Sequence, residues 1–479
     1  MELDKDLAAR QEARFLSRQA EKAQRTLGAM SQEQLDRIVE AIAKAFSAAA
    51  PELAELAVQE TGFGNVEDKI TKNRFASEQV AKAIRGMKTV GVLKEDPREK
   101  LWELGIPVGV IAAIIPSTNP TSTVCYNAMI AIKAGNTIVF SPHPKALACS
   151  LRAAQVVAQA AKQAGAPEGT VGCLSRASMA GCQELMGVPE VKLILATGGP
   201  GMVKAAYSSG KPAIGVGAGN GPAYIHRTAD VKRAIGCILR SKTFDNGTVC
   251  ASEQSIIVEK CMEATVLEEA ASQGFYLMNP REAEALAKLL FRGDGSLNPA
   301  IVGKAAAELA SMAGFPIPRN TRILLAREQQ AGPSRPYSME KLCPVLAFYV
   351  MDSEDAVLEK CVEILTHEGS GHTFSMHAED SDVVRRFAAG IPVSRFLVNT
   401  PAALGGIGAT TGMFPALTLG CGAVGGSSSS NNISPLDLMN IRRVAWGQEE
   451  GQAPSQAGEP DSRLVEMLTQ KILERINQY

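Results

Sequence analysis

The stretch Val108-Gly109-Val110-Ile111-Ala112-Ala113-Ile114-Ile115 is a continuous apolar run that ends at Pro116. Two further short apolar runs, 137–140 and 191–196, each end in a turn rich in proline, serine or glycine. Alanine-rich stretches near 121–134 and 145–165 separate these runs and have a helical character. Short buried strands that alternate with helices predict βαβ units and a parallel sheet. Ligands of such α/β folds bind at the carboxyl ends of the strands, where these turns lie.

The segments before and after this predicted sheet also have patterns that indicate helices and strands. Apolar residues at helical spacing predict a helix over 32–46, with Ser31 and Gln34 as a capping box, and a second helix after Pro51. A second α/β region is expected from about 226 to 420, with strands that include 255–258, 345–350 and 396–398.

Composition excludes several classes of protein. The chain has 479 residues, of which 46% are hydrophobic and 21% charged, and this balance is that of a globular protein. A net charge of −1 argues against electrostatic binding of nucleic acid. We find no apolar run of membrane-spanning length and no hydrophobic signal core near the N-terminus. We therefore expect a cytoplasmic protein with reduced thiols and no membrane partner.

Among the ten cysteines, Cys250 has the most informative surroundings. It follows the turn signal Asn246-Gly247 and precedes a predicted strand, so its thiol is expected to be partly exposed and rigidly held. By spacing alone a structural thiol remains the alternative. Asn119, taken alone, is equally compatible with a turn residue before Pro120.

Two other patterns are weak when taken alone. Thr197-Gly198-Gly199 ends a strand and opens a helix near Met202, and the free N–H groups of a helix N-terminus suit a pyrophosphate. His367, His372 and His377 are spaced by five residues, which does not place them on one helix face, and no metal site is expected.

Several ordered motifs together carry a resemblance over roughly residues 30–445. The sequence resembles the aldehyde dehydrogenase superfamily, in its CoA-acylating branch, and is similar to the aldehyde-oxidising half of bifunctional alcohol–aldehyde dehydrogenases. The motifs are Glu60-Thr61-Gly62 with Val66-Glu67-Asp68-Lys69, Pro107–Pro120, Ala134-Gly135-Asn136-Thr137, Ser141-Pro142-His143-Pro144, Ala196–Gly199, Gly217-Ala218-Gly219-Asn220, Phe244-Asp245-Asn246 leading to Cys250, Glu340 with Cys343-Pro344-Val345, and Leu417–Gly422.

This resemblance implies a reaction and its residues. Cys250 is the expected nucleophile, which attacks an aldehyde to form a thiohemiacetal. A hydride then moves from this adduct to NAD, and the resulting thioester on Cys250 transfers its acyl group to coenzyme A. Asn119 is the expected oxyanion donor. His372 is expected near the active site. The residues expected to bind the cofactor are Ser117, His143, Thr197, Gly198, Gly199, Gly217 and Glu340.

Two departures from the family pattern bear on the acyl acceptor and on the cofactor. Val216 stands where hydrolytic members have the glutamate that activates water, which favours a thiol acceptor such as coenzyme A. Ser141 and Pro144 stand where a lysine and a glutamate for the adenosine ribose are typical, so His143 is a candidate substitute. The choice between NAD and NADP is left open, although acylating relatives usually use NAD.

The resemblance also implies a domain plan. We expect a Rossmann-like cofactor-binding domain over 1–225 with an oligomerisation hairpin near 92–106, a catalytic domain over 226–420, and a return to the cofactor domain with an oligomerisation strand over 421–447. A homodimer or homotetramer is expected. A polar linker over 448–461 and an amphipathic helix over 462–479 follow, and they resemble an encapsulation peptide that binds a shell protein of a bacterial microcompartment.

The substrate is expected to be a short-chain aldehyde, acetaldehyde or propionaldehyde. A sulfonated aldehyde, sulfoacetaldehyde, remains an alternative because the sequence holds no diagnostic arginine for or against it. A cysteine acyltransferase of the thiolase type is the alternative from another enzyme class, but it would leave the nicotinamide-site motifs without a purpose.

Overall fold

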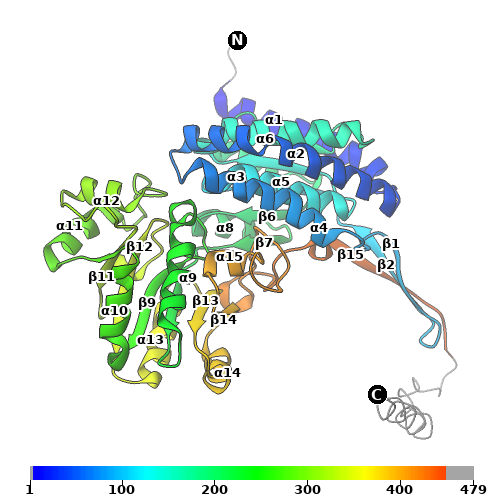
Figure 1. The fold of residues 1–479 in the computed structure, drawn as a ribbon. Coiled ribbons are helices and arrows are strands. Elements are labelled where there is room, and N and C mark those ends of the chain that lie inside the picture. Colours follow the sequence, from blue (N-terminus) through cyan, green and yellow to red (C-terminus); the bar gives the residue numbers. More distant parts are fainter. Residues whose placement is uncertain (1–3, 449–479) are drawn as a thin grey trace, which may run out of the picture.

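The computed structural model describes residues 4–448 and builds them around three β-sheets (Figure 1). Two are parallel sheets of five and seven strands, and the third is an antiparallel sheet of three strands. The two parallel sheets confirm the predicted α/β fold. Within the described residues, no helix is long and apolar enough to cross a membrane.

The five-stranded sheet contains the apolar run at 108–115. Along β3, Ile111, Ala113 and Ile115 face one core, while the alternating residues between them face another, as the two-residue period of a strand requires. The strands, in their order across the sheet, are β5 (Val171–Cys173), β4 (Ile138–Pro142), β3 (Val110–Ile115), β6 (Val191–Thr197) and β7 (Ala213–Val216).

Helices cover both faces of this sheet (Figure 1). On one face lie α2 (Gln32–Thr61), α5 (Pro120–Lys133) and α6 (Leu147–Gln163), with α3 (Val66–Arg74) and α4 (Val80–Ile84) beside them. On the other face lie α1 (Lys5–Leu27), α7 (Met179–Gly187) and α8 (Pro200–Tyr207).

The expectation of two helices separated at Pro51 is wrong, because α2 runs unbroken through this residue. Phe46, Ala50 and Leu53 continue one buried stripe across the proline, so packing against the core outweighs the lost backbone hydrogen bond. The predicted capping box is confirmed, since Ser31 and Gln34 each bind the other's backbone N–H.

The seven-stranded sheet forms the second half of the molecule. Its strands, in order, are β10 (Phe275–Leu277), β11 (Ile323–Arg327), β12 (Val345–Met351), β9 (Glu253–Glu259), β8 (Gly221–Ile225), β13 (Gly371–His377) and β14 (Val393–Val398). The predicted strands at 255–258, 345–350 and 396–398 lie within β9, β12 and β14. The helices around this sheet are α9 (Val231–Thr243), α10 (Glu263–Ser272), α11 (Pro280–Leu290), α12 (Ala306–Ala313), α13 (Glu354–His367), α14 (Ser381–Gly390) and α15 (Ala402–Gly406).

Strand β8 lies on the far side of the expected domain boundary. Residues 221–225 were expected to end the first domain, but β8 pairs with β9 and β13 inside the seven-stranded sheet. The chain therefore leaves the five-stranded sheet at Val216, the end of β7, and enters the other sheet at Gly221. Sequence patterns place strands, but they do not reveal which sheet a short strand joins.

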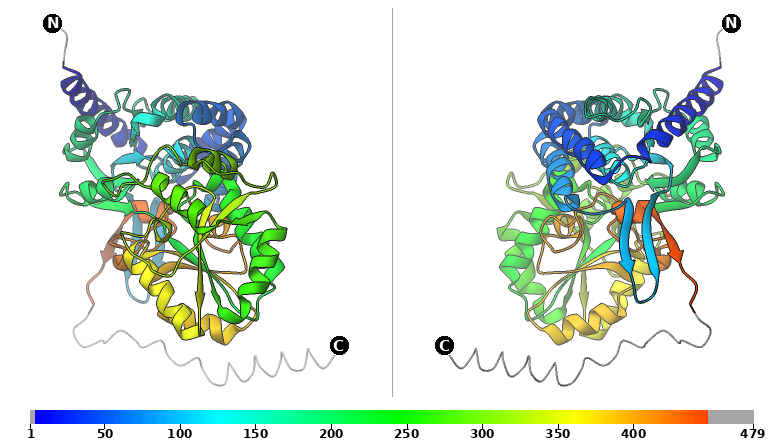
Figure 2. Two further views of the ribbon diagram at one scale, coloured as in Figure 1. Left: turned by 90° about the vertical axis from the view of Figure 1, so that its left-hand side faces the viewer. Right: turned by 90° about the vertical axis from the view of Figure 1, so that its right-hand side faces the viewer.

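The three-stranded sheet projects away from both large sheets (Figures 1 and 2). It joins the hairpin of β1 (Gly91–Asp96) and β2 (Leu101–Pro107) to β15 (Met439–Ala445). The hairpin lies close to the one expected at 92–106, and β15 lies within the segment 421–447. The expected linker at 448–461 and the helix at 462–479 lie outside the described residues, apart from Gln448.

Candidate functional site

A cavity of about 480 Å³ lies where the two parallel sheets face each other. Nine of the ten residues proposed from the sequence line it, so the structure brings together segments that are far apart in the chain. These nine residues are Ser117, Asn119, His143, Thr197, Gly198, Gly199, Gly217, Cys250 and Glu340.

One wall of the cavity is made by loops at the carboxyl ends of the five-stranded sheet. The residues 116–119 follow β3, His143 follows β4, 197–199 close β6, and 216–218 close β7. Four of the five strands therefore deliver a loop to one edge, as the rule for ligand binding in parallel sheets predicts.

The other wall comes from the amino ends of the seven-stranded sheet. Cys250 lies three residues before β9, Glu340 precedes β12, and Glu368 precedes β13. Gly219, which precedes β8, packs so closely that a Cβ atom there would lie 1.9 Å from the carbonyl oxygen of Cys250. Only glycine fits at this position, and it anchors the segment between the two sheets against the backbone of the cysteine.

Cys250 itself is half-buried and its thiol is free. Burial, followed by the nearby Glu340 carboxyl group, raises the pKa of Cys250 to about 12, while the Arg395 guanidinium acts in the opposite direction. The thiol form is therefore favoured at neutral pH, and a ligand that brings positive charge or a hydrogen-bond donor to the sulfur would favour the thiolate.

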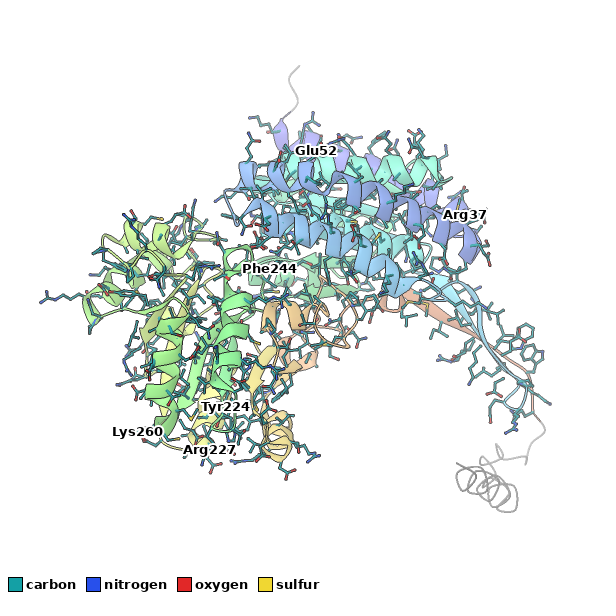
Figure 3. The ribbon with its side chains drawn as sticks, in the orientation of Figure 1. Arg37, Glu52, Tyr224, Arg227, Phe244 and Lys260 are labelled. Carbon is teal, nitrogen blue, oxygen red and sulfur yellow. The ribbon has the colours of Figure 1, made fainter. Side chains whose placement is uncertain are left out.

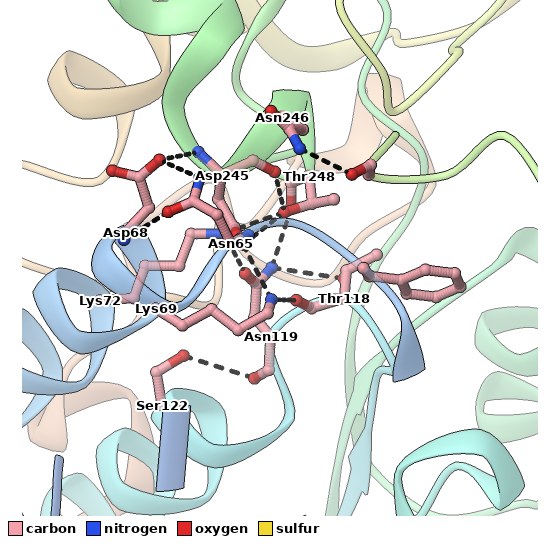
Figure 4. Close-up of polar contacts among 12 residues, drawn as sticks. Asn65, Asp68, Lys69, Lys72, Thr118, Asn119, Ser122, Asp245, Asn246 and Thr248 are labelled. Atoms are coloured by element: carbon pink, nitrogen blue, oxygen red, sulfur yellow. Dashed lines mark hydrogen bonds and ion pairs between the residues drawn. The ribbon is translucent and has the colours of Figure 1, made fainter. Parts of the chain in front are cut away.

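Asn119 lies at the N-cap of α5 and directs its side chain toward the segment before Cys250 (Figure 4). Its Nδ2 group donates to the Thr248 carbonyl oxygen at 3.2 Å and to Thr118 Oγ1 at 3.3 Å, and its Oδ1 atom accepts from Lys72 Nζ at 2.6 Å. The amide therefore has a fixed orientation close to the cysteine.

A buried charge cluster supports the turn that precedes Cys250 (Figure 4). Asp245 is fully buried, and its Oδ2 atom accepts from Lys69 Nζ at 2.9 Å and from Lys72 Nζ at 2.5 Å. Burial opposes ionisation of Asp245, but the two ammonium groups outweigh it and hold the pKa of this carboxyl below its usual range. The cluster ties helix α3 to the cysteine loop.

Sequence reasoning quoted several residues of this cluster within motifs but gave them no role. Lys69 and Lys72 are spaced by three residues on α3 and therefore lie on the same helical face. Asp245 and Asn246 have the positive φ angles 48° and 51°, which give the turn its left-handed backbone. The neighbouring Phe244, labelled in Figure 3, lies at the junction of the two halves with its ring 5.5 Å from Lys72 Nζ.

The first wall has the open, polar surface that a dinucleotide requires. The Thr197 hydroxyl is buried and makes no hydrogen bond to any residue in the described part of the chain. A Cβ atom at Gly199 or Gly217 would meet nothing within 4 Å, so these positions border open space. A second cavity of about 130 Å³ adjoins the same turn, and its walls include the apolar residues Ile114, Pro142 and Met202.

Helix α8 begins directly after this turn, at Pro200, close to the start expected near Met202. Its N-cap, Gly199, has no side chain to bind the first N–H groups, which leaves them for a ligand. Together, the free hydroxyl, the helix start and the adjoining cavity with its apolar residues fit a phosphate-linked ring system.

Glu340 joins the second wall to the segment between the sheets. Its Oε1 atom accepts from the Gly219 N–H at 3.0 Å, and its own backbone N–H donates to Glu368 Oε2 at 2.7 Å. Burial, followed by the nearby Glu368 carboxylate, raises the pKa of Glu340 to about 8. Glu368 was not singled out from the sequence, where nothing but its glutamate side chain would have marked it.

His372 does not line the cavity. It is fully buried in β13, and its Cε1 atom lies 3.2 Å from the position that a Cβ at Gly219 would take. Burial, followed by the Arg395 guanidinium, lowers its pKa well below the usual value, so the ring is neutral. His372 therefore lies behind the cysteine backbone rather than in contact with the cavity.

The other histidines have separate positions. His143 is exposed at the cavity edge, and its Nδ1 atom accepts from the Lys145 N–H at 3.1 Å. His367 ends α13, whereas His372 and His377 both lie in β13, so these three are not on one helix. Within residues 4–448, no cluster of His, Cys, Asp and Glu has the arrangement of a metal site.

Comparison with known proteins gives the following matches. The model of the aldehyde dehydrogenase family matches residues 5–283. The bifunctional aldehyde-alcohol dehydrogenase AdhE of Escherichia coli K12 is 46% identical over 440 residues, which are 91% of this chain and 49% of that protein. The chain thus spans about half the length of this relative.

Two relatives match over most of their own length. The succinate-semialdehyde dehydrogenase (acetylating) of Clostridium kluyveri is 37% identical, with 92% of this chain and 97% of that protein covered. The sulfoacetaldehyde dehydrogenase (acylating) of Cupriavidus necator is 36% identical, with 89% and 87% covered.

Solved structures match the whole fold. An acetylating aldehyde dehydrogenase from Geobacillus thermoglucosidasius has a TM-score of 0.92 and 47% identity, with 94% of this chain and 99% of that chain covered. The propionaldehyde dehydrogenase from the fucose utilisation bacterial microcompartment of Clostridium phytofermentans has a TM-score of 0.82 and 29% identity, with 94% and 99% covered. That of Rhodopseudomonas palustris, with bound CoA and an acylated cysteine, has a TM-score of 0.81 and 28% identity, with 91% and 97% covered.

Proposed function

The chain belongs to the aldehyde dehydrogenase family, and we propose that it is a CoA-acylating member. In this proposal it oxidises a short-chain aldehyde with NAD and coenzyme A to an acyl-CoA and NADH. The observation that carries the proposal is the shared cavity, in which Cys250, Asn119 and the turn 197–199 face one another across two sheets. Acylating relatives and a neighbour with bound CoA support the choice of acceptor.

The first chemical step uses Cys250 and Asn119. Cys250 first loses its thiol proton to solvent. The thiolate sulfur then attacks the aldehyde carbon, the carbonyl π electrons move to oxygen, and a thiohemiacetal anion forms. The Asn119 Nδ2 group and the Cys250 backbone N–H donate to this oxygen, and donors held in place before the reaction cost no reorganisation. The hydride then leaves the carbon, and the carbon–oxygen double bond re-forms as a thioester on Cys250.

The dinucleotide, when bound, supplies the acceptor for this hydride. Thr197, with its free hydroxyl, and the turn of Gly198 and Gly199 at the start of α8 would hold the pyrophosphate. Glu340, which binds the Gly219 N–H, is placed beside the cysteine and would hold the nicotinamide ribose. Ser117, Gly217 and His143 would complete the contacts along the cavity wall.

Thioester release is proposed to use the thiol of coenzyme A rather than water. Val216, at the end of β7, lines the cavity with an apolar side chain at the position where hydrolytic relatives carry a glutamate. The two carboxyl groups that do line the cavity are those of Glu340 and Glu368. With a pKa of about 8, the Glu340 carboxyl is mostly protonated at neutral pH, so the carboxylate form that could take a proton from water is the minor form there.

The lining of the cavity favours an uncharged aldehyde. Among the described residues that form it, His143 is the sole basic side chain, and the acidic side chain of Glu368 would repel an anion. A sulfonate or carboxylate on the substrate would need a lysine or arginine partner. We therefore place acetaldehyde and propionaldehyde ahead of sulfoacetaldehyde, the substrate in the name of one relative.

The test is NADH absorbance with two- to four-carbon aldehydes and sulfoacetaldehyde, each measured with and without coenzyme A. We expect turnover of the uncharged aldehydes to depend on coenzyme A and to yield a thioester detectable by mass spectrometry. A full rate without coenzyme A would overturn the acylating assignment, and a higher kcat/KM for sulfoacetaldehyde would overturn the substrate class.

We further propose a homodimer or homotetramer that is housed in a bacterial microcompartment. The antiparallel sheet carries exposed apolar side chains at Trp102 and Ile441, and Trp446 follows directly after β15, a composition that suits a subunit contact. A neighbour from a microcompartment supports the location. Light scattering of the purified protein tests the oligomeric state. Residues 462–479 fused to a fluorescent protein test the location in a microcompartment, because diffuse fluorescence in shell-producing cells would contradict it.

A further inference from the structure

The ammonium group of Lys72 binds the side chain proposed as the oxyanion donor. Its three N–H donors meet three acceptors: Asn119 Oδ1 at 2.6 Å, Asp245 Oδ2 at 2.5 Å and Thr248 Oγ1 at 3.1 Å (Figure 4). A lysine has no acceptor and three donors, so this set uses its full capacity. Lys72 is 3% exposed, and solvent does not compete for these bonds.

This contact fixes which way the Asn119 amide faces. The two ends of an asparagine amide have nearly the same shape, but only the oxygen accepts a hydrogen bond. A flipped amide would point its NH₂ group at the ammonium of Lys72 and its oxygen at the carbonyl of Thr248, so both contacts would become repulsive. Lys72 thereby selects the orientation in which Nδ2 lies on the side of Thr248, two residues before Cys250.

The bonds on the Nδ2 side are long, at 3.2 Å to Thr248 O and 3.3 Å to Thr118 Oγ1. The bond on the Oδ1 side is short, at 2.6 Å. A long bond is readily exchanged for a shorter bond to an anion, whereas the short bond keeps the amide in place. The positive charge on Lys72 also withdraws electron density from the amide, which strengthens Nδ2 as a donor.

We propose that Lys72 is a positioning residue that orients and polarises Asn119 for the anion formed at Cys250. This inference rests on the proposed function, because it assigns a role within that reaction. Asp245 holds the ammonium in place, and Lys69 shares the carboxylate. No part of the proposal requires Lys72 to touch the substrate.

Lys69 offers a matched control within the same cluster. It lies on the same helix and is 3% exposed, like Lys72, and it binds the same Asp245 oxygen. Its other bond goes to the Thr118 carbonyl oxygen at 3.0 Å, and no bond joins it to the Asn119 amide. Loss of either lysine removes one cation from Asp245, but only loss of Lys72 frees the amide.

The experiment is a double-mutant cycle with Lys72→Met and Asn119→Ala, beside the control Lys69→Met. We expect Lys72→Met to lower kcat by about 10- to 100-fold while the KM values for aldehyde and NAD change by less than about threefold. In the Asn119→Ala background, the same change is expected to cost less than about threefold, because the residue it positions is already gone. Lys69→Met should lower kcat by less than Lys72→Met does.

Additive losses in the cycle, or equal losses from the two lysine variants, would overturn the proposal and leave a purely structural cluster. If Lys72→Met does not fold, the cycle is run in Lys69→Met/Lys72→Met/Asp245→Asn, which removes the three charges that meet at Asp245. Adding Asn119→Ala to that protein should again cost little. Wild-type protein that fails to reduce NAD with aldehyde and coenzyme A would instead refute the proposed function.

Discussion

The two walls of the cavity are built by opposite ends of two parallel sheets. Loops at the carboxyl ends of β3, β4, β6 and β7 supply glycines, hydroxyls, the Asn119 amide and the imidazole of His143. Segments before β9, β12 and β13 supply Cys250 and two glutamates, and the pKa values of Cys250 and Glu340 are shifted upward by burial. One wall is suited to holding ligands, and the other is suited to reacting with them.

The connection between the sheets explains this division. The chain passes from β7 to β8 through residues 217–220, and Gly219 in this crossing packs directly on the backbone of Cys250. The carboxyl end of one sheet is thereby placed against the amino end of the next. A ligand site can therefore follow the carboxyl-end rule on one side and depart from it on the other.

The largest expected effect comes from the reacting wall. Cys250→Ala is expected to lower aldehyde oxidation by more than about 10³-fold, since no other group on the path can hold the acyl intermediate. NADH binding, followed by fluorescence, should change little because the opposite wall is intact. If the variant remained active, another residue would have to be the nucleophile, and the proposed division between a holding wall and a reacting wall would be wrong.

Asn119→Ala tests the one residue on the holding wall that is also proposed to take part in the chemistry. Loss of a preorganised oxyanion donor costs about 10²–10³ in kcat, or about 3–4 kcal/mol, with little change in KM. Steady-state kinetics with acetaldehyde check this value. A change confined to the KM for NAD would make Asn119 a ligand-binding residue like its neighbours.

A side chain at Gly199 should impair the holding wall alone. The backbone of Gly199 has φ −65° and ψ 161°, which valine adopts freely, and a Cβ there meets nothing within 4 Å. Gly199→Val is therefore expected to raise the KM for NAD about tenfold, or about 1.4 kcal/mol, without loss of thermal stability. Gly201→Ala, also next to open space, is the control and should leave the KM unchanged. An unchanged KM in the valine variant would exclude this turn from the cofactor site.

The last expected effect needs no substitution and is a change in the reactivity of Cys250 with pH. Because burial raises the pKa of Cys250 to about 12, its thiolate fraction in the ligand-free protein should grow about tenfold for each pH unit. The rate of iodoacetamide modification, followed on the peptide that contains Cys250, should rise from pH 7 to pH 10 without a plateau. A plateau below pH 9 would show a thiolate that is already stabilised without ligands.

The sequence predicted the holding wall better than the reacting wall, for a physical reason. Apolar runs such as 108–115 mark strands, and the turns after them mark an edge, so Thr197 and Gly199 were placed by local pattern. The position of Cys250 in a turn before a strand was also readable. The assignment of Cys250 as the nucleophile came from family motifs, and so did the roles given to Asn119 and Glu340.

What the sequence did not predict depends on contacts between distant segments. Lys72 and Asp245 are 173 residues apart, and only the packing of α3 against the cysteine turn reveals their pairing. Glu368 and His372 are neighbours in the chain, but the fold sends one to the cavity and the other behind it. The β7–β8 crossing was likewise hidden, because no sequence pattern assigns residues 221–225 to one sheet or the other.

The most direct test of the two-wall site is to run the proposed reaction in reverse, starting from its product, an acyl-CoA. We expect acetyl-CoA or propionyl-CoA to acylate the peptide that contains Cys250, as seen by mass spectrometry, and NADH to discharge it with release of the aldehyde. Asn119→Ala should slow both steps. Acylation at another of the ten cysteines, or an acyl group on Cys250 that NADH cannot remove, would contradict a site in which one wall holds the dinucleotide and the other carries the thioester.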